Sequence, residues 1–183
     1  MNTSAFVKIK NLLKNDKLKK YNTTKEDIIY LVEINKKNRF EIVNDKIRAR
    51  QGHSQELSDY YNLDPLKLLV IFTPIPNTYV VHGTFKENLS SIKKNGLNAS
   101  SRKYIHFTLM KKKKNKYIQI VESGIRQNTE ALIIINIEEA INEGIVFYQA
   151  SNGVILTEGI DGVLYKNKNN FISEIITDPS MWR

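Results

Sequence analysis

Cysteine is absent from the 183 residues of this chain, and its absence excludes several classes of protein at once. A disulfide-stapled scaffold, an enzyme with a catalytic thiolate and a zinc site with cysteine ligands all require this residue. A chain without cysteine suits a reducing compartment, so we expect a cytoplasmic protein.

Long hydrophobic runs are also missing. The longest are Leu68 to Phe72 and Ala131 to Ile135, far short of the roughly 20 apolar residues that span a bilayer. The first residues, Met-Asn-Thr-Ser-Ala-Phe-Val-Lys, contain no apolar stretch of the kind found in secretory signals. We therefore expect a protein that is neither secreted nor inserted in a membrane.

Several catalytic signatures are absent as well. The chain has no Gly-x-Ser-x-Gly elbow, no phosphate-binding Walker loop and no His-Glu-x-x-His metal motif. His53, His82 and His106 are the only three histidines, and their spacing matches no familiar metal site. We expect no bound metal.

Acidic residues are scarce relative to basic ones. The chain has 28 Lys and Arg against 19 Asp and Glu, which gives a net charge of +9. This excess indicates an anionic partner, most commonly a nucleic acid. A lysine-rich surface that reflects only skewed genome composition is the alternative. The hydrophobic share of 41% is enough for a packed core.

The first third of the chain predicts helices followed by a hairpin. Thr24 is a good N-cap for a helix, with an acid three residues later at Asp27. We also expect an extended segment over 6–9 and a helix over 10–20. Alternating residues over 39–51 predict a hairpin around Asn44-Asp45. Its apolar face would contact the helices and consist of Phe40, Ile42, Ile47 and Ala49, with Arg39, Arg48 and Arg50 on the opposite face.

The remainder of the chain predicts mostly strands. Residues 55–65 have the composition of a connector, and Lys111–Lys114 that of a solvated loop. A helix over 86–95 ends at Gly96, and a short helix covers 138–142. Asn152-Gly153 is a strong hairpin signal. We expect strands over 78–81, 104–109, 130–137, 145–149, 154–157 and 162–165.

Two short motifs place basic and ring side chains beside glycine. The first is Ile47-Arg48-Ala49-Arg50-Gln51-Gly52-His53-Ser54, and the second is Val81-His82-Gly83-Thr84. Arginine donates paired hydrogen bonds to phosphate, and glycine lets the backbone approach a ligand. His82-Gly83-Thr84 alone could equally be an ordinary turn. Tyr104 and His106 share a strand face, either as core or as a platform for a ligand ring.

These motifs occur together with others in one order along the chain. Gly96-Leu97, Ser101-Arg102-x-Tyr104-Ile105-His106-Phe107, Ser123-Gly124-Ile125-Arg126 and Ser151-Asn152-Gly153-Val154 follow the first two. The series resembles the NAD-dependent RNA 2'-phosphotransferase family (KptA type), from about Phe6 to about Tyr165. The order of several motifs is specific, whereas each motif alone is not.

The resemblance implies an α+β fold with two lobes. Residues 1–65 would form a winged-helix lobe that binds RNA and phosphate. Residues 66–183 would form an ADP-ribosyltransferase-like lobe with a split β-sheet that binds NAD. The protein is expected to act as a monomer on RNA bearing a 2'-phosphate, or on another nucleic acid.

The resemblance also implies a two-step reaction. The RNA 2'-phosphate left by tRNA ligation attacks the nicotinamide ribose of NAD, and nicotinamide leaves. The neighbouring ribose hydroxyl then attacks the phosphate, which releases RNA with a 2'-hydroxyl and ADP-ribose cyclic phosphate. Such chemistry rests on positioning and on cations that neutralise phosphate oxygens, and needs no metal.

Site residues follow from the resemblance, position by position. Catalytic roles fall on Arg48 and Arg126. NAD binding falls on His82, Gly83, Thr84, Ser101, Arg102, Tyr104, His106, Asn152 and Val154. RNA binding falls on Arg39, Arg50, Gln51, His53 and Ser54.

The chain departs from the family pattern at two places. The family has an adjacent arginine and histidine near its N-terminus, and the first forty residues here contain only Arg39 and no histidine. Tyr104 stands where the family has a histidine. Three interpretations therefore remain open: 2'-phosphotransfer with a reduced site, ADP-ribose transfer to another acceptor such as a nucleic-acid end, base or protein, and an inactive nucleic-acid-binding relative.

Overall fold

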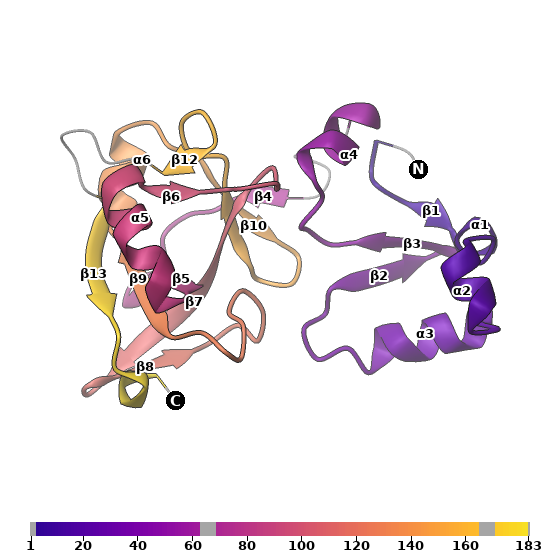
Figure 1. Ribbon diagram of the computed structural model, residues 1–183, viewed down its shortest axis with the longest axis horizontal. Helices are drawn as coiled ribbons and strands as arrows, with labels where there is room; N and C mark the ends of the chain where they lie inside the picture. The colour runs from indigo at the N-terminus through magenta and orange to yellow at the C-terminus, as the bar shows by residue number, and fades with distance from the viewer. Residues whose placement is uncertain (1–2, 63–68, 165–170, 183) are drawn as a thin grey trace.

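The computed structural model describes residues 3–62, 69–164 and 171–182 of the chain. Helices and strands are both present, so the expected mixed α+β class is confirmed. Figure 1 shows a small sheet with helices at one end of the molecule and a large sheet at the other. We refer to residues 3–62 as the N-terminal part and to the described residues from 69 onward as the C-terminal part.

The helices of the N-terminal part are α1 (Ile9–Leu12), α2 (Asp16–Lys20) and α3 (Lys25–Glu33). The predicted capping box of α3 is present, with Thr24 and Asp27 bonded reciprocally. The single helix expected over 10–20 is wrong. Asn15 has extended backbone angles and its side chain accepts from the Lys17 N–H, so it caps a second helix instead of continuing the first.

A three-stranded sheet completes this part, in the order β1 (Val7–Lys8), β3 (Lys46–Ala49), β2 (Phe40–Val43). The predicted hairpin is confirmed. Asn44 and Asp45 both have positive φ, of 46° and 60°, as a two-residue hairpin turn with the twist of the strands requires. The turn pairs Ile42 with Ile47, and one position further it pairs Glu41 with Arg48.

Apolar side chains from the hairpin and the helices form a small core. Ile9, Ile28 and Ile47 are buried, and Ile42 packs against them. Phe40 differs from the expectation, because 40% of it is exposed and it lies outside this cluster. The apolar face of the hairpin is therefore limited to its turn-proximal half.

The predicted connector over 55–65 contains a helix, α4 (Gln55–Tyr60). Ser54 begins it, because its hydroxyl accepts from the Leu57 N–H. A short polar segment can thus be helical when it has a cap. The last residues of the predicted connector, including Pro65, lie outside the described residues.

An eight-stranded sheet forms the C-terminal part, in the order β13-β9-β5-β7-β11-β10-β4, with β8 paired to β7. The named neighbours are all antiparallel. The strands are β4 (Leu69–Ile71), β5 (Thr78–Thr84), β7 (Ile105–Lys113), β8 (Lys116–Gln119), β9 (Ala131–Ile135), β10 (Phe147–Ala150), β11 (Ile155–Thr157) and β13 (Ile172–Ile176).

The two central strands, β5 and β7, pair over only part of their length. Their register runs from Thr78 opposite Lys111 to Val81 opposite Thr108. Beyond that point His82–Thr84 pairs only with β9, while Ile105–Phe107 pairs with β11. Backbone pairing of the two strands therefore ends at His82, whose Nδ1 lies 2.8 Å from the carbonyl oxygen of His106 on β7. We refer to this place as the split.

One large core lies beneath this sheet. It includes Val80, Phe107, Ile133, Phe147 and Ile155, each no more than 2% exposed. Partly buried side chains of α5 (Leu89–Asn95) and α6 (Ile137–Asn142) pack against it. The 3-10 turn η2 (Lys86–Asn88) precedes α5, and Gly96, with φ of 80°, ends that helix as expected.

Several expectations for the C-terminal part need correction. The lysine run is not a loop, because Lys111–Lys113 continues β7 and pairs with β8. The sequence did not predict β4, β8 or β13. The strand expected over 162–165 is β12 (Val163–Leu164), which pairs with β6 (Leu97–Asn98), and Tyr165 lies outside the described residues. The chain ends near the 3-10 turn η3 (Pro179–Met181).

Candidate active site

His82 lies at the split between β5 and β7. Its Nδ1 is 2.8 Å from the backbone carbonyl oxygen of His106, so Nδ1 carries the proton and donates. Nε2 is then the acceptor of the ring. Burial lowers the pKa of His82, and the positive charge of Arg126 lowers it further, against the opposing effect of the bond to His106. His82 is therefore neutral at physiological pH.

His106 shows the same tautomer. Its Nδ1 lies 2.9 Å from the carbonyl oxygen of Tyr104, and burial, helped by Arg102, lowers its pKa to about 4. Its Nε2 is 2.7 Å from the Gln51 side-chain oxygen. Two acceptors cannot bond, so we infer that the Gln51 amide presents its nitrogen to the neutral ring.

The segment after β3 reaches the same place from the N-terminal part. A side chain at Gly52 would begin 3.8 Å from His106 Nε2 and 3.9 Å from the Arg102 guanidinium. Ser54 and Arg102 form an isolated β-bridge, and Arg102 reaches His106 Nε2 at 3.4 Å. The first motif thus lies against the strand that carries His106.

Gly83 is required for space and not for backbone freedom. A β-carbon there would lie 2.9 Å from Thr129 Oγ1 and 3.2 Å from a side-chain carbon of Ile125. The glycine lets the loop before β9 close over β5. That loop also carries Arg126, whose charge acts on His82.

A cluster of opposite charges lies on the hairpin. The Glu41 carboxylate binds Arg48 Nε and also Arg50, at 3.2 Å. Arg48 further donates to the Ser4 carbonyl oxygen at 3.2 Å, and its guanidinium stacks 4.6 Å from the Phe6 ring centre. One carboxylate between two guanidiniums leaves a net positive charge. The cluster is well shielded, since the charged side chains are only 15–18% exposed.

Arg50 connects the N-terminal part of the molecule to the C-terminal part. Arg50 donates to Ser151 Oγ at 2.7 Å, in the turn between β10 and β11. Burial, and then the charge of Arg48, lower the pKa of His53, so this ring also favours its neutral form. The hairpin cations are therefore held beside neutral imidazoles and the β10–β11 turn.

Two buried polar atoms near that turn have no hydrogen-bond partner among the described residues. They are the hydroxyl oxygen of Tyr104 and the amide nitrogen of Asn152. Burial, and then the negative charge of Glu158, raise the pKa of Tyr104, so its hydroxyl stays protonated. Buried polar groups are normally bonded, so these two are suited to contact a ligand.

Other predicted residues do not join the split. Val154 is fully buried in an apolar cluster with Leu156, and the buried hydroxyl of Thr84 accepts from the Asn88 side chain at 3.4 Å. Ser101 and the Arg39 side chain are exposed. The roles assigned to these four residues remain predictions.

Sequence reasoning missed two residues that shape the site. The position of Glu41 could have been predicted from the hairpin, because a two-residue turn at Asn44-Asp45 places Glu41 opposite Arg48. Lys37 connects the two parts, since its carbonyl accepts from Ser123 Oγ at 2.5 Å and its ammonium donates to the Ile125 carbonyl at 3.3 Å. No local signal indicates the second contact, which spans 86 to 88 residues.

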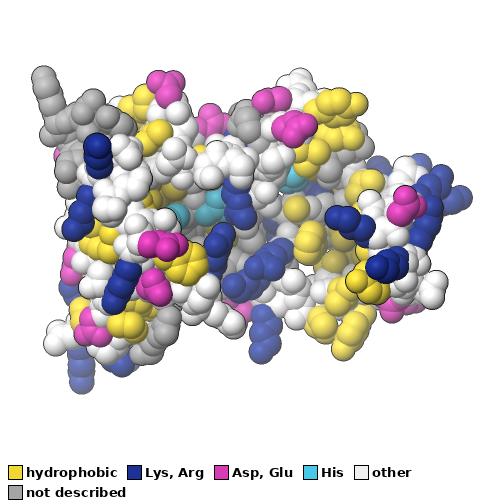
Figure 2. All heavy atoms as spheres, in the orientation of Figure 1, with side chains coloured by type: hydrophobic (Ala, Val, Ile, Leu, Met, Phe, Trp, Pro, Cys, Tyr) yellow, Lys and Arg dark blue, Asp and Glu magenta, His cyan; other side chains and the backbone are white. Residues whose placement is uncertain are grey.

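Figure 2 shows Lys and Arg side chains gathered on the middle of one face, where the N-terminal and C-terminal parts meet. Histidine side chains are visible beside them. Within the described ranges, no three His, Cys, Asp or Glu side chains lie close enough to hold a metal ion. None of the described helices has the length and apolar character needed to cross a membrane.

The separation of β5 from β7, the neutral histidines beside it and the arginines of the hairpin describe a mixed α+β protein with a basic candidate site. Comparison with known sequences identifies the family. The profile described as RNA 2'-phosphotransferase, Tpt1 / KptA family, matches residues 1–159, and the chain belongs to this family.

Individual relatives agree with the family match. The tRNA 2'-phosphotransferase 1 of Bos taurus is 35% identical over 173 residues, covering 90% of this chain and 63% of the relative. A probable RNA 2'-phosphotransferase of Thermococcus kodakarensis is 31% identical over 157 residues, covering 85% and 78%. One of Rhizobium leguminosarum bv. trifolii is 34% identical over 143 residues, covering 77% and 68%. The chain thus spans somewhat less than two thirds of the bovine protein.

Proposed function

We propose that this chain is an NAD-dependent RNA 2'-phosphotransferase. In this proposal residues 1–65 are a winged-helix-like lobe that binds RNA and phosphate. Residues 66–183 are an ADP-ribosyltransferase-like lobe whose split sheet binds NAD. Family membership and the names of the relatives support the activity.

The residues at the split are compatible with NAD. The hydroxyl of Tyr104 and the amide nitrogen of Asn152 are buried donors without partners among the described residues. His82 and His106 are neutral, so they add no positive charge beside a cationic nicotinamide ring. When bound, NAD would supply the ADP-ribosyl group to which the RNA 2'-phosphate is transferred as nicotinamide departs.

The arginines would bind and orient the phosphate. Arg126 lies near enough to His82 to lower its pKa, and its exposed guanidinium is available to a substrate anion. Arg48 and Arg50 share Glu41 and retain a net positive charge. Guanidiniums neutralise phosphate oxygens at any physiological pH and stabilise charge that develops in transfer.

One observation carries the proposal. Gln51, directly after the arginine-bearing strand β3, reaches His106 in the split of the large sheet, 55 residues away in sequence, at 2.7 Å. In this proposal, Gln51 belongs to the motif that binds phosphate and His106 to the motif that binds NAD, so the contact supports a shared site. A reaction between RNA phosphate and NAD requires such convergence.

Nicotinamide release tests the proposal. The protein is incubated with NAD and one of three otherwise identical RNAs, with an internal 2'-phosphate, a terminal phosphate or no phosphate. A 2'-phosphotransferase releases nicotinamide only with the first RNA. Release that is independent of the 2'-phosphate would contradict the proposal.

Tyr104 favours a second candidate, ADP-ribose transfer to another acceptor. A buried, protonated tyrosine hydroxyl replaces the histidine that the family resemblance leads one to expect at this position. An enzyme of this kind leaves a stable ADP-ribose adduct on its acceptor. The 2'-phosphotransferase instead leaves RNA with a free 2'-hydroxyl, so product mass separates the two candidates.

A further inference from the structure

The hairpin formed by β7 and β8 carries the strongest concentration of charge in the described chain away from the split. Lys111, Lys112, Lys113, Lys114 and Lys116 lie within it, and residues 111–119 contain no acid. All five lysines are exposed. Because the run extends a strand, Lys111 and Lys113 project from one face of the hairpin and Lys112 from the other.

Two features of this hairpin are unfavourable for the isolated protein. Lys113 lies directly opposite Lys116, and like charges across an antiparallel pair destabilise it. Lys114 has φ of 54°, a left-handed conformation that its neighbour Asn115 would adopt more easily. An anion bound across the hairpin would offset the repulsion.

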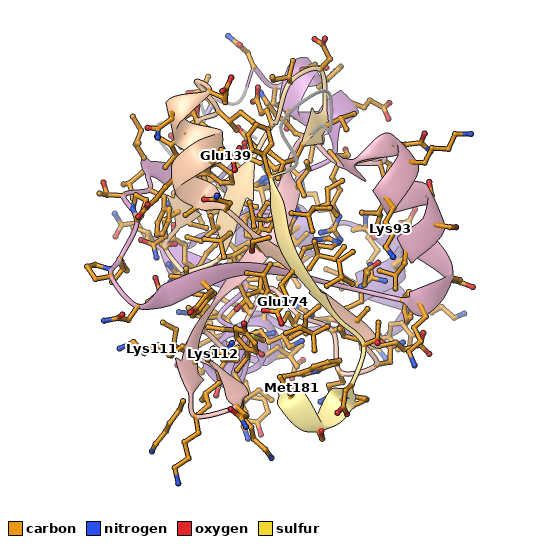
Figure 3. The ribbon with its side chains drawn as sticks, turned by 90° about the vertical axis from the view of Figure 1, so that its left-hand side faces the viewer. Lys93, Lys111, Lys112, Glu139, Glu174 and Met181 are labelled. Carbon is orange, nitrogen blue, oxygen red and sulfur yellow. The ribbon has the colours of Figure 1, made fainter. Side chains whose placement is uncertain are left out.

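The base of the hairpin is firmly attached to the large sheet. The Lys112 ammonium lies 5.0 Å from the centre of the Tyr117 ring. Tyr117 is 2% exposed and donates to Glu174 of β13 at 2.7 Å. Figure 3 shows Lys111 and Lys112 on one side of the molecule and Lys93 on the other. The lysines therefore occupy a fixed position relative to the sheet.

The same strand leads to the candidate active site. His106 and Lys112 are six residues apart on β7, which corresponds to about 20 Å at roughly 3.3 Å per residue. An RNA whose reacting nucleotide lies at the split needs only a few further nucleotides to reach the lysines. A very short RNA cannot contact both places.

We propose that the β7–β8 hairpin binds the phosphate backbone of the RNA several nucleotides away from the reacting 2'-phosphate. This inference rests on the proposed function and extends it, because it assigns a second contact to the same substrate. The hairpin contributes affinity that depends on RNA length and salt but not on sequence.

The test compares two substrates, a trinucleotide with one 2'-phosphate and an RNA of about twenty nucleotides with the same central linkage. The hairpin variant combines three substitutions, Lys111→Gln, Lys113→Gln and Lys114→Asn. It keeps Lys112 and its contact with Tyr117. The control, Lys86→Gln, Lys93→Gln, Lys94→Gln, removes three charges from the η2–α5 segment. Steady-state kcat and KM are measured from low to moderate salt.

The hairpin variant should raise KM for the long RNA several-fold and leave kcat unchanged. The slope of log affinity against log salt concentration should become shallower by about 2. Each phosphate contact to a single strand contributes about 0.7 to this slope, and the variant removes three lysines. The trinucleotide should show no change, and the control should behave as the unmodified protein. An unchanged KM for the long RNA, or an equal rise in the control, would overturn the assignment.

Failure of the proposed function is distinguishable from failure of this inference. If no RNA is turned over, fluorescence anisotropy still measures binding of the labelled long RNA to the protein and to both variants. Weaker binding by the hairpin variant alone supports the surface, and equal binding by all three proteins refutes it. If the trinucleotide is turned over but the long RNA gains no affinity, only the hairpin proposal fails.

Discussion

The imidazole of His82 bridges the two central strands where their backbone pairing stops, by donating from Nδ1 to the carbonyl oxygen of His106 at 2.8 Å. The side chain thus makes a hydrogen bond that the β5–β7 ladder no longer provides, since that ladder ends with Val81 opposite Thr108. The bond orients the ring and selects its tautomer. A neutral ring is the state in which this arrangement is most stable.

Stability should therefore depend on pH through His106. Its pKa is about 4 in the folded protein against 6.5 for an ordinary histidine, so the unfolded chain binds the proton first as pH falls. Stability from this residue is fully present above pH 6.5 and is lost as pH falls through 6.5 toward about 4. His82 acts in the same direction.

Urea unfolding at pH 7 and pH 5 measures this effect. Acidic residues also titrate at low pH, so the informative quantity is the difference between the unmodified protein and His106→Gln. The variant should lose less stability between the two pH values. An equal loss in both proteins would show that His106 is not held neutral by the fold.

Arg126→Ala should lower kcat by roughly 10²–10³, the usual effect of removing one group that stabilises transition-state charge. Folding should survive, because Arg126 is exposed. Arg126→Lys should recover part of the activity, since lysine keeps the charge but not the paired donors. Lys94→Ala, an exposed cation on α5, is the control and should leave turnover unchanged. Full activity in both Arg48→Ala and Arg126→Ala would contradict the assigned roles.

Glu41→Gln should impair turnover even though Glu41 itself is not expected to contact the substrate. The carboxylate holds the guanidiniums of Arg48 and Arg50, so its loss leaves two adjacent cations without their shared partner. We expect a loss of about 1–3 kcal/mol in unfolding free energy, as for removal of one partner of a shielded polar pair. Arg48 should no longer be held in a single orientation, so kcat should fall more than RNA affinity.

An exposed pair provides the matched control for this variant. Asp16 binds Lys19 at 3.0 Å, with 96% of the Asp16 side chain exposed. Asp16→Asn should change stability by less than about 0.5 kcal/mol and leave kcat unchanged. If Glu41→Gln were as harmless as Asp16→Asn, Glu41 would not position the arginines.

Local chemistry explains which elements could be predicted. The hairpin at Asn44-Asp45 and the helix after Thr24 follow from turn and cap residues that act within four positions. The break at Asn15 and the helix after Ser54 follow the same rules but were hidden by the surrounding polar sequence. Local signals were therefore sufficient where they coincided with a clear apolar pattern.

Long-range pairing explains what could not be predicted. Backbone pairing between β5 and β7 ends at Val81 and Thr108, while β11 pairs with the opposite edge of β7 over Ile105–Phe107. No local pattern in either strand indicates where this pairing ends. The lysines at 111–113 form a strand because β8 pairs with them, despite their charge. Arg48 and Arg50 were recognised as basic site residues, but their shared carboxylate, Glu41, was not.

Gly83→Ala should destabilise the protein by about 1–3 kcal/mol, because the added methyl group overpacks a tight contact. The new carbon would lie 2.9 Å from Thr129 Oγ1 and displace the loop that carries Arg126. The double variant Gly83→Ala, Thr129→Ala removes the nearest obstruction and should cost less than the sum of the single changes. Thermal unfolding of the four proteins measures this coupling. Additive losses would show that the loop does not close on Gly83.

The mass of the RNA after reaction shows whether the protein is a 2'-phosphotransferase. A short RNA with one internal 2'-phosphate is incubated with NAD and the protein, and the RNA is analysed by mass spectrometry. We expect loss of the phosphate from the RNA and appearance of ADP-ribose cyclic phosphate. A persistent ADP-ribose adduct on the RNA, or RNA of unchanged mass, would contradict it.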